Sequence, residues 1–337
     1  MNIKDCLFAL SEADGAGCLT AASDLALAKL REFVPAERGQ GLTVIARLPG
    51  KTEHTIMIDA HIDQVSMVVT DVDEEGFLTV AKAGGLDLRA LPSRPVTVHG
   101  KEAIPAVFCA TPPHLAKGER DYTDLSEIKL DTGLGSHAKE LVSPGDVVTF
   151  SAKPIELAGD KVSGRSLDDR AGVVCLLALA ERLAGKELPC GVWLVLSDGE
   201  ELGLRGVRPA AYTVQPDEAI AVDVTFGDGP GISPEECGKL GAGPMIGYSP
   251  ALDRAVSDKL EQIAKEHDIP YQTEVMGAST GTNADAIGIS RGGVKACTLS
   301  IPLRNMHTET EVISLSDVEN TVALLERYLL AGGIADA

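Results

Sequence analysis

Histidines and carboxylates occur at the ends of several predicted strands and helices in this chain. Taken singly, a histidine or an acidic pair at such a position usually has a structural role. Here five separate segments carry these groups, namely His61 with Asp63, Asp168 with Asp169, Glu200 with Glu201, Asp223, and His307. Because ligands of open α/β sheets bind outside the carboxyl ends of the parallel strands, we expect these side chains to meet at one edge of a sheet.

Carboxylates held close together raise one another's pKa unless a cation neutralises them. Imidazole and carboxylate ligands without thiolates suit Zn²⁺, Mn²⁺ or Co²⁺, and a bridging carboxylate allows two ions about 3.5 to 4 Å apart. His61 and Asp63 also fit a metal ligand whose second ring nitrogen is oriented by a carboxylate. The residues therefore predict a site for divalent ions.

Glu200 and Glu201 are adjacent, and successive side chains of an extended chain point in opposite directions. This favours divided roles, in which one glutamate binds metal and the other takes a proton from the attacking water as general base. The residues alone leave open which glutamate has which role. Structural interpretations also remain, since Asp168 and Asp169 could cap a helix and the two glutamates could form an exposed acidic turn.

The elements around these residues predict an α/β fold. A helix is expected over residues 20–33, and strands over 42–48 and 55–60 are expected to form a hairpin. Short β-type segments broken by Gly and Pro follow from Met67 to about Asp160. After them, helices and strands alternate over residues 171–183, 191–197, 218–224, 253–267, 295–301 and 316–330. This alternation predicts a mainly parallel sheet flanked by helices, built from both ends of the chain.

Composition excludes several classes of protein. The chain has 337 residues, of which 44% are hydrophobic and 24% charged, so it is neither disordered nor collagen-like. Its net charge of -20 disfavours nucleic acid and anionic membranes as partners. No apolar segment approaches the roughly 20 residues of a membrane span. The N-terminus lacks the core of a signal peptide, and the seven cysteines have no C-x-x-C spacing, which favours a cytoplasmic location.

Five segments together resemble the glutamyl aminopeptidase and tetrahedral aminopeptidase family in type, order and spacing. They are Ala60-His61-Ile62-Asp63, Leu167-Asp168-Asp169-Arg170, Glu200-Glu201-Leu202-Gly203-Leu204-Arg205-Gly206, Ala221-Val222-Asp223-Val224-Thr225, and Ser300-Ile301-Pro302-Leu303-Arg304-Asn305-Met306-His307-Thr308. The resemblance extends over about residues 42–330, and the combination is more specific than any one segment.

The resemblance implies a role for each candidate residue. Asp168 would bridge two divalent ions, Zn, Co or Mn, with Glu201 and His307 completing one site. His61 and Asp223 would complete the other site. Glu200 would be the general base, and Asp63 would orient His61. A cis peptide bond is implied between Asp168 and Asp169.

The resemblance also implies a domain organisation. Residues 1–66 and 161–337 would form the catalytic α/β domain, and residues 67–160 an inserted small β-barrel that mediates dimerisation. Related proteins commonly assemble twelve subunits into a hollow tetrahedral particle, so a homo-oligomer is expected. Two departures stand out, since Gln64 occupies a position where the family usually has Glu, and Asn283 and Asp285 stand in the opposite order to the family loop.

These features predict a metal-dependent aminopeptidase that hydrolyses N-terminal residues from peptides. One alternative is another hydrolase on the same metal centre, such as an N-acyl amino acid deacylase or a carboxypeptidase. Glycoside hydrolysis is disfavoured, because it usually needs a metal-free carboxyl pair. A non-catalytic peptide-binding scaffold is the remaining alternative, and it is disfavoured because all candidate ligands and the candidate base are present.

Overall fold

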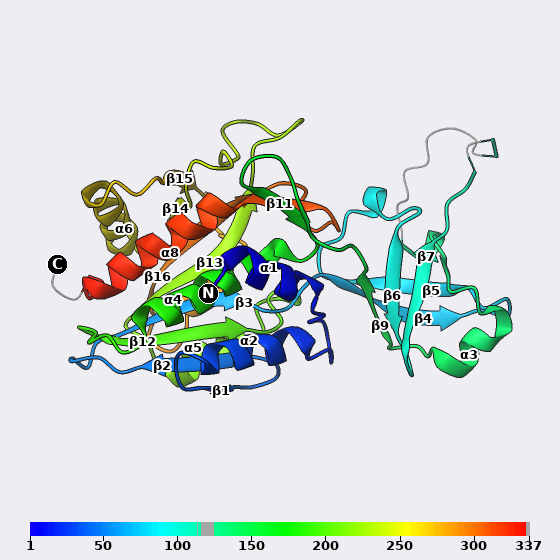
Figure 1. Cartoon of the computed structure of the whole chain (residues 1–337), viewed down its shortest axis with the longest axis horizontal. Helices are drawn as coiled ribbons and strands as arrows, with labels where there is room; N and C mark the ends of the chain where they lie inside the picture. The colour runs from blue at the N-terminus through cyan, green and yellow to red at the C-terminus, as the bar shows by residue number, and fades with distance from the viewer. Residues whose placement is uncertain (113, 116–124, 335–337) are drawn as a thin grey trace.

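The computed structural model describes residues 1–112, 114–115 and 125–334, and its largest sheet has eight strands (Figure 1). The strands in sheet order are β1 (Ala36–Arg38), β2 (Val44–Leu48), β12 (Gly191–Ser197), β3 (Thr55–His61), β13 (Glu218–Phe226), β16 (Lys295–Leu303), β14 (Met245–Tyr248) and β15 (Gln272–Val275). The four central strands β12, β3, β13 and β16 are parallel. Because β2 and β14 run antiparallel to them, the sheet as a whole is mixed.

Helices cover both faces of this sheet. One face packs against α1 (Ile3–Glu12), α2 (Ala21–Arg31), α4 (Leu167–Leu183), α6 (Arg254–Glu266) and α8 (Leu315–Leu330). The other packs against α5 (Val207–Val214) and α7 (Ala284–Gly288). Side chains of β3 alternate between the two faces. Ile56 and Ile58 belong to the hydrophobic core under α1, α2, α4, α6 and α8, and Met57 belongs to the core under α5 and α7. Burial on both faces explains why the central strands are continuous apolar segments.

A closed β-barrel lies beside the sheet in Figure 1 and has a hydrophobic core of its own. Its strands in order around the barrel are β4 (Ser66–Val72), β5 (Leu78–Ala83), β8 (Leu130–Asp131), β7 (Ala103–Phe108), β6 (Pro95–His99) and β9 (Val147–Phe150). The short helices near it are η1 (Leu88–Ala90), η2 (Leu125–Glu127), η3 (Gly135–His137) and α3 (Ala138–Leu141). A third sheet contains β10 (Ile155–Glu156), β11 (Lys161–Gly164) and β17 (Glu311–Ser314).

The structure confirms the α/β sheet flanked by helices and the small barrel. The predicted hairpin is wrong, because β12 lies between β2 and β3 and pairs with both. Helix α1 was not predicted. The domain boundaries at residues 66 and 160 stay a prediction, and residues 113 and 116–124 of the predicted inserted domain lie outside the described residues. In the part of the chain that the structure describes, no helix has both the length and the apolar character needed to span a bilayer.

Candidate active site

The predicted residues meet at the carboxyl ends of the parallel strands, around a cavity of about 550 Å³. His61 ends β3 and pairs in register with Ser197, the last residue of β12, so the turn that follows β12 begins beside it. Of the seven residues to which the resemblance gives a role, six line the cavity, namely His61, Asp168, Glu200, Glu201, Asp223 and His307. They come from five segments that are far apart in the sequence, as the strand-end pattern predicts.

Asp168 lies between the two histidines. Its Oδ1 is 3.0 Å from His61 Nε2, and its Oδ2 is 3.2 Å from His307 Nε2. Glu201 Oε1 lies 3.5 Å from the same nitrogen of His307, and Asp223 Oδ1 lies 3.8 Å from that of His61. The five residues therefore form two groups, one with each histidine, that share the carboxylate of Asp168.

The electrostatics of these groups suit cations. Burial, together with the charge of Asp168, raises the pKa of Glu201 to about 9. Burial likewise holds the pKa of Asp223 well above its usual range. Burial has the same tendency at Asp168, but His307 and His61 outweigh it and lower the pKa of that carboxyl. Imidazole nitrogens and carboxylate oxygens are ligands that Zn²⁺, Mn²⁺ and Co²⁺ accept, so this donor set fits divalent ions.

Asp63 lies behind the cavity and is 4% exposed. Its Oδ1 accepts a hydrogen bond of 3.0 Å from the backbone N–H of Glu200, and its Oδ2 one of 3.2 Å from that of Glu201. Asp63 Oδ1 is also 3.4 Å from His61 Nδ1. One carboxylate thus contacts both the histidine at the end of β3 and the turn that carries the two glutamates.

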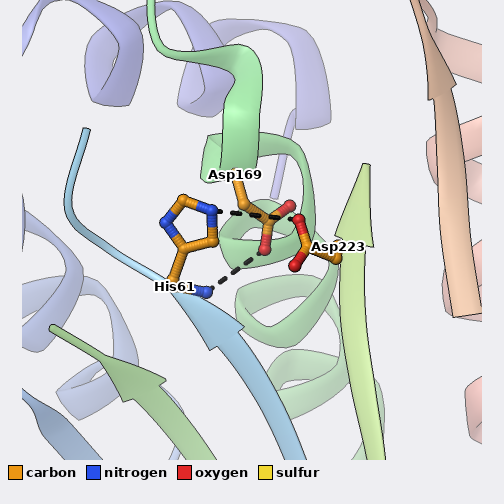
Figure 2. Close-up of side chains that lie close together, drawn as sticks. All are labelled: His61, Asp169 and Asp223. Atoms are coloured by element: carbon orange, nitrogen blue, oxygen red, sulfur yellow. Dashed lines mark hydrogen bonds and ion pairs between the residues drawn. The ribbon is translucent and has the colours of Figure 1, made fainter. Parts of the chain in front are cut away.

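Asp169 faces the same histidine from the start of α4. Its Oδ2 accepts a 3.2 Å hydrogen bond from the backbone N–H of His61, and its Oδ1 a 2.9 Å hydrogen bond from that of Gly172. The second bond is a helix-capping interaction. Figure 2 shows His61, Asp169 and Asp223 facing one another from three segments. Each of the three has one ligand atom within 4.8 Å of those of the other two. The peptide bond between Asp168 and Asp169 is cis.

Glu311 is a buried part of the site that the sequence did not reveal. Its Oε1 accepts a 2.8 Å hydrogen bond from the backbone N–H of His307, and its Oε2 one of 3.2 Å from that of Asp168. It is 1% exposed, although it stands in a polar segment typical of an exposed turn. Pairing of β17 with β11 buries it, and no local sequence signal announces this long-range contact.

Gln64, which stands where the family usually has Glu, lies next to the site and contacts the buried guanidinium of Arg170. Gln64 Oε1 accepts hydrogen bonds from Arg170 Nη2 at 3.2 Å and from the backbone N–H of Gly15 at 3.1 Å. Arg170 has no exposed surface, and its Nε and Nη1 have no hydrogen-bond partner among the described residues. Burial lowers the pKa of Arg170 to about 10. The buried guanidinium of Arg170 therefore has the neutral amide of Gln64 as its partner, at a position that a glutamate carboxylate would also fit.

We expect Gln64→Glu to stabilise the protein. The glutamate keeps the shape of glutamine, supplies a charged acceptor to Arg170 and removes the unpartnered Nε2 of Gln64, and we expect a gain of about 1 kcal/mol in the free energy of unfolding. Thermal unfolding of both proteins in the same buffer measures the effect. Gln40→Glu at an exposed position is the matched control and should leave Tm unchanged. A Tm for Gln64→Glu at or below that of the wild type would contradict the argument.

Proteins with similar sequences and structures define the class of this enzyme. The lysyl aminopeptidase of Pyrococcus furiosus is 32% identical over 295 residues, covering 85% of this chain and 84% of that one. The structure of aminopeptidase APDkam598 from Desulfurococcus kamchatkensis superposes with a TM-score of 0.91 at 28% identity, covering 98% of this chain and 94% of that one. The TET1 peptidase of Pyrococcus horikoshii, described as assembling into a tetrahedron or a large octahedral shell, gives 0.87 at 30% identity over 97% and 99%. The class is therefore that of the aminopeptidases, hydrolases that act on peptides.

The model of the M42 glutamyl aminopeptidase family matches residues 43–324. This match covers most of the chain and includes every candidate site residue. The chain therefore belongs to the M42 glutamyl aminopeptidase family, as the resemblance predicted.

Proposed function

We propose that this aminopeptidase holds two divalent cations that share Asp168. Glu201 and His307 would complete one site, and His61 and Asp223 the other. The observation that carries the proposal is the position of Asp168, whose two oxygens lie 3.0 and 3.2 Å from the Nε2 atoms of two different histidines. A carboxylate with one oxygen toward each group of ligands is suited to bridging two ions.

Each residue near the proposed ions has a distinct task. When bound, the cations would polarise the scissile carbonyl as Lewis acids and lower the pKa of the attacking water. Glu200 lines the cavity and would take the proton of that water and pass it to the leaving amine. Burial raises the pKa of Glu200, which brings this group closer to the pKa suited to a base at neutral pH.

Two further carboxylates would position this machinery. Asp63 accepts the backbone N–H groups of Glu200 and Glu201, so it would hold the base and a metal ligand in fixed orientations. Glu311 would do the same for the segments of Asp168 and His307. Removal of such supporting contacts commonly lowers metal affinity or activity by about 10- to 100-fold.

The assembly is also part of the proposal. All six barrel strands lie between Ser66 and Phe150, which supports assigning residues 67–160 to an inserted domain for dimerisation and residues 1–66 and 161–337 to the catalytic domain. The tetrahedral and octahedral assemblies of the relative from P. horikoshii support a closed homo-oligomer for this chain. A closed chamber would admit short or unfolded peptides and exclude folded proteins.

Hydrolysis of three kinds of substrate by the purified protein tests the proposed activity. We expect release of p-nitroaniline from aminoacyl anilides and no comparable turnover of N-acyl amino acids or a β-glucan. Cleavage confined to the N-acyl amino acids would show a deacylase on the same site. Glucan hydrolysis that persists in a chelator would contradict the metal-dependent reaction altogether.

A further inference from the structure

A second, larger cleft of about 1030 Å³ adjoins the cavity that holds the candidate active site. It lies between barrel residues such as Arg94 and Phe150 and the edge of the main sheet at β15. Four residues line both the cleft and the cavity, namely Phe226, Glu274, Met276 and Met306. Three of them are apolar, and Glu274 is the only charged residue of the four.

Glu274 has an acceptor atom without a regular hydrogen bond in the part of the chain that the structure describes. Its Oε1 accepts a hydrogen bond from the Thr225 hydroxyl, two residues beyond Asp223 on β13. Its Oε2 is buried and accepts no hydrogen bond of regular geometry among the described residues, although burial, which raises the pKa of Glu274, is opposed by the nearby Ser300 hydroxyl, which lowers it. Thr225 lies on the same side of β13 as Asp223, because side chains alternate along a strand. Glu274 is thus attached to the strand of a proposed metal ligand.

The charges around Glu274 make it distinctive. Among the described residues that line the active-site cavity, none is Lys or Arg. Apart from the proposed catalytic group, the described lining of the cavity has two carboxylates, Glu274 and Asp285. Asp285 is already paired with the hydroxyl groups of Ser279 and Thr280 and with backbone N–H groups. In the larger cleft, Arg89 pairs with Asp87, and Arg94 pairs with Glu309. Among the described residues, the carboxylate of Glu274 therefore has no cationic partner.

We propose that Glu274 determines specificity by binding the cationic side chain of an N-terminal Lys or Arg residue of the substrate. Phe226, Met276 and Met306 would pack against the aliphatic part of that side chain, whose charged end needs a polar partner. This inference rests on the proposed function, since it places the N-terminal residue beside the two cations. The buried acceptor of Glu274 becomes paired when such a substrate binds.

Kinetics with anilides of lysine, arginine, methionine, leucine and N-ε-acetyl-lysine test this proposal. Acetylation keeps the aliphatic chain of lysine but adds an acetyl group to its end and removes its charge, and methionine provides an uncharged side chain without that extra bulk. We expect kcat/KM for lysine and arginine to exceed that for acetyl-lysine and methionine by about 10- to 100-fold, the effect of one buried charge pair. Glu274→Gln should abolish that advantage and leave leucine within about threefold of the wild type, while Glu319→Gln, an exposed control on α8, changes neither.

Other outcomes would overturn the proposal in recognisable ways. An equal loss on every anilide in Glu274→Gln would mean that Glu274 binds the substrate's α-ammonium or supports the fold. Equal kcat/KM of the wild-type enzyme for the acetyl-lysine and lysine anilides would contradict the proposal. This test needs no variant, so it remains decisive even if Glu274→Gln folds poorly. Absence of activity on all five anilides would instead contradict the proposed function itself.

Discussion

Glu200→Gln is expected to keep its bound metal and to lose turnover by about 10²- to 10⁴-fold, the contribution typical of general acid–base catalysis. Glutamine keeps the shape of the side chain but cannot accept the proton of the attacking water. The backbone N–H of Glu200 that Asp63 binds is unaffected by the substitution, so the turn after β12 should retain its geometry. Steady-state kinetics on aminoacyl anilides, with bound metal measured on the same samples, provide the test.

The adjacent residue provides a matched control for this variant. Glu201→Gln makes the same chemical change one residue away, in the group that faces His307. We expect it to lose metal as well as turnover, because a proposed ligand is neutralised. If Glu200→Gln keeps substantial turnover, or if the two variants lose metal equally, the division of roles between these glutamates is wrong.

Asp168→Asn is expected to lower metal content and reduce kcat/KM by about 10³-fold or more, because Lewis-acid stabilisation of the transition state amounts to several kcal/mol. Asparagine removes the charge and leaves one carboxamide oxygen where the carboxylate has two. Since each oxygen of Asp168 faces a different histidine, both proposed sites should be weakened together. Metal analysis by mass spectrometry measures the content of the variant and the wild type.

A substitution at an exposed carboxylate separates this effect from a general change in charge. Glu140→Gln lies on α3 of the barrel, with 74% of its side chain exposed, and should leave metal content and kcat/KM at wild-type values. Full metal content in Asp168→Asn would remove Asp168 as the shared ligand. Retention of half the metal would show that its two oxygens do not serve two sites.

The central strands could be predicted from the sequence because their burial is visible in it. The predicted segment at 191–197 has the bounds of β12, and those at 218–224 and 295–301 lack only the last two residues of β13 and β16. These strands are covered on both faces, so their sequences are almost continuously apolar. The pairing order could not be read in the same way. Strand β12 inserts between two strands that are neighbours in sequence, and only the complete set of pairings shows this.

The candidate site was predictable where its residues end apolar strands. His61 and Asp223 follow from this pattern, because strand ends in a parallel sheet share one edge. Asp169 was expected at the same edge, with a helix cap as the structural alternative, and it does both. Its Oδ1 accepts a hydrogen bond from the backbone N–H of Gly172, and its Oδ2 accepts one from that of His61. Glu311 was not predicted to be part of the site. Glu311 reaches the site through the pairing of β17 with β11, across a separation in sequence that no local pattern spans.

The dependence of hydrolysis on metal is the measurement that tests the central claim most directly. Aminoacyl p-nitroanilides would be assayed with the purified protein, after chelation, and after separate return of Zn²⁺, Co²⁺ and Mn²⁺, with the bound metal counted at each stage. We predict that chelation abolishes the release of p-nitroaniline and that at least one ion restores it as two ions bind per chain. Hydrolysis that continues unchanged after the metal has been removed would contradict the proposed mechanism.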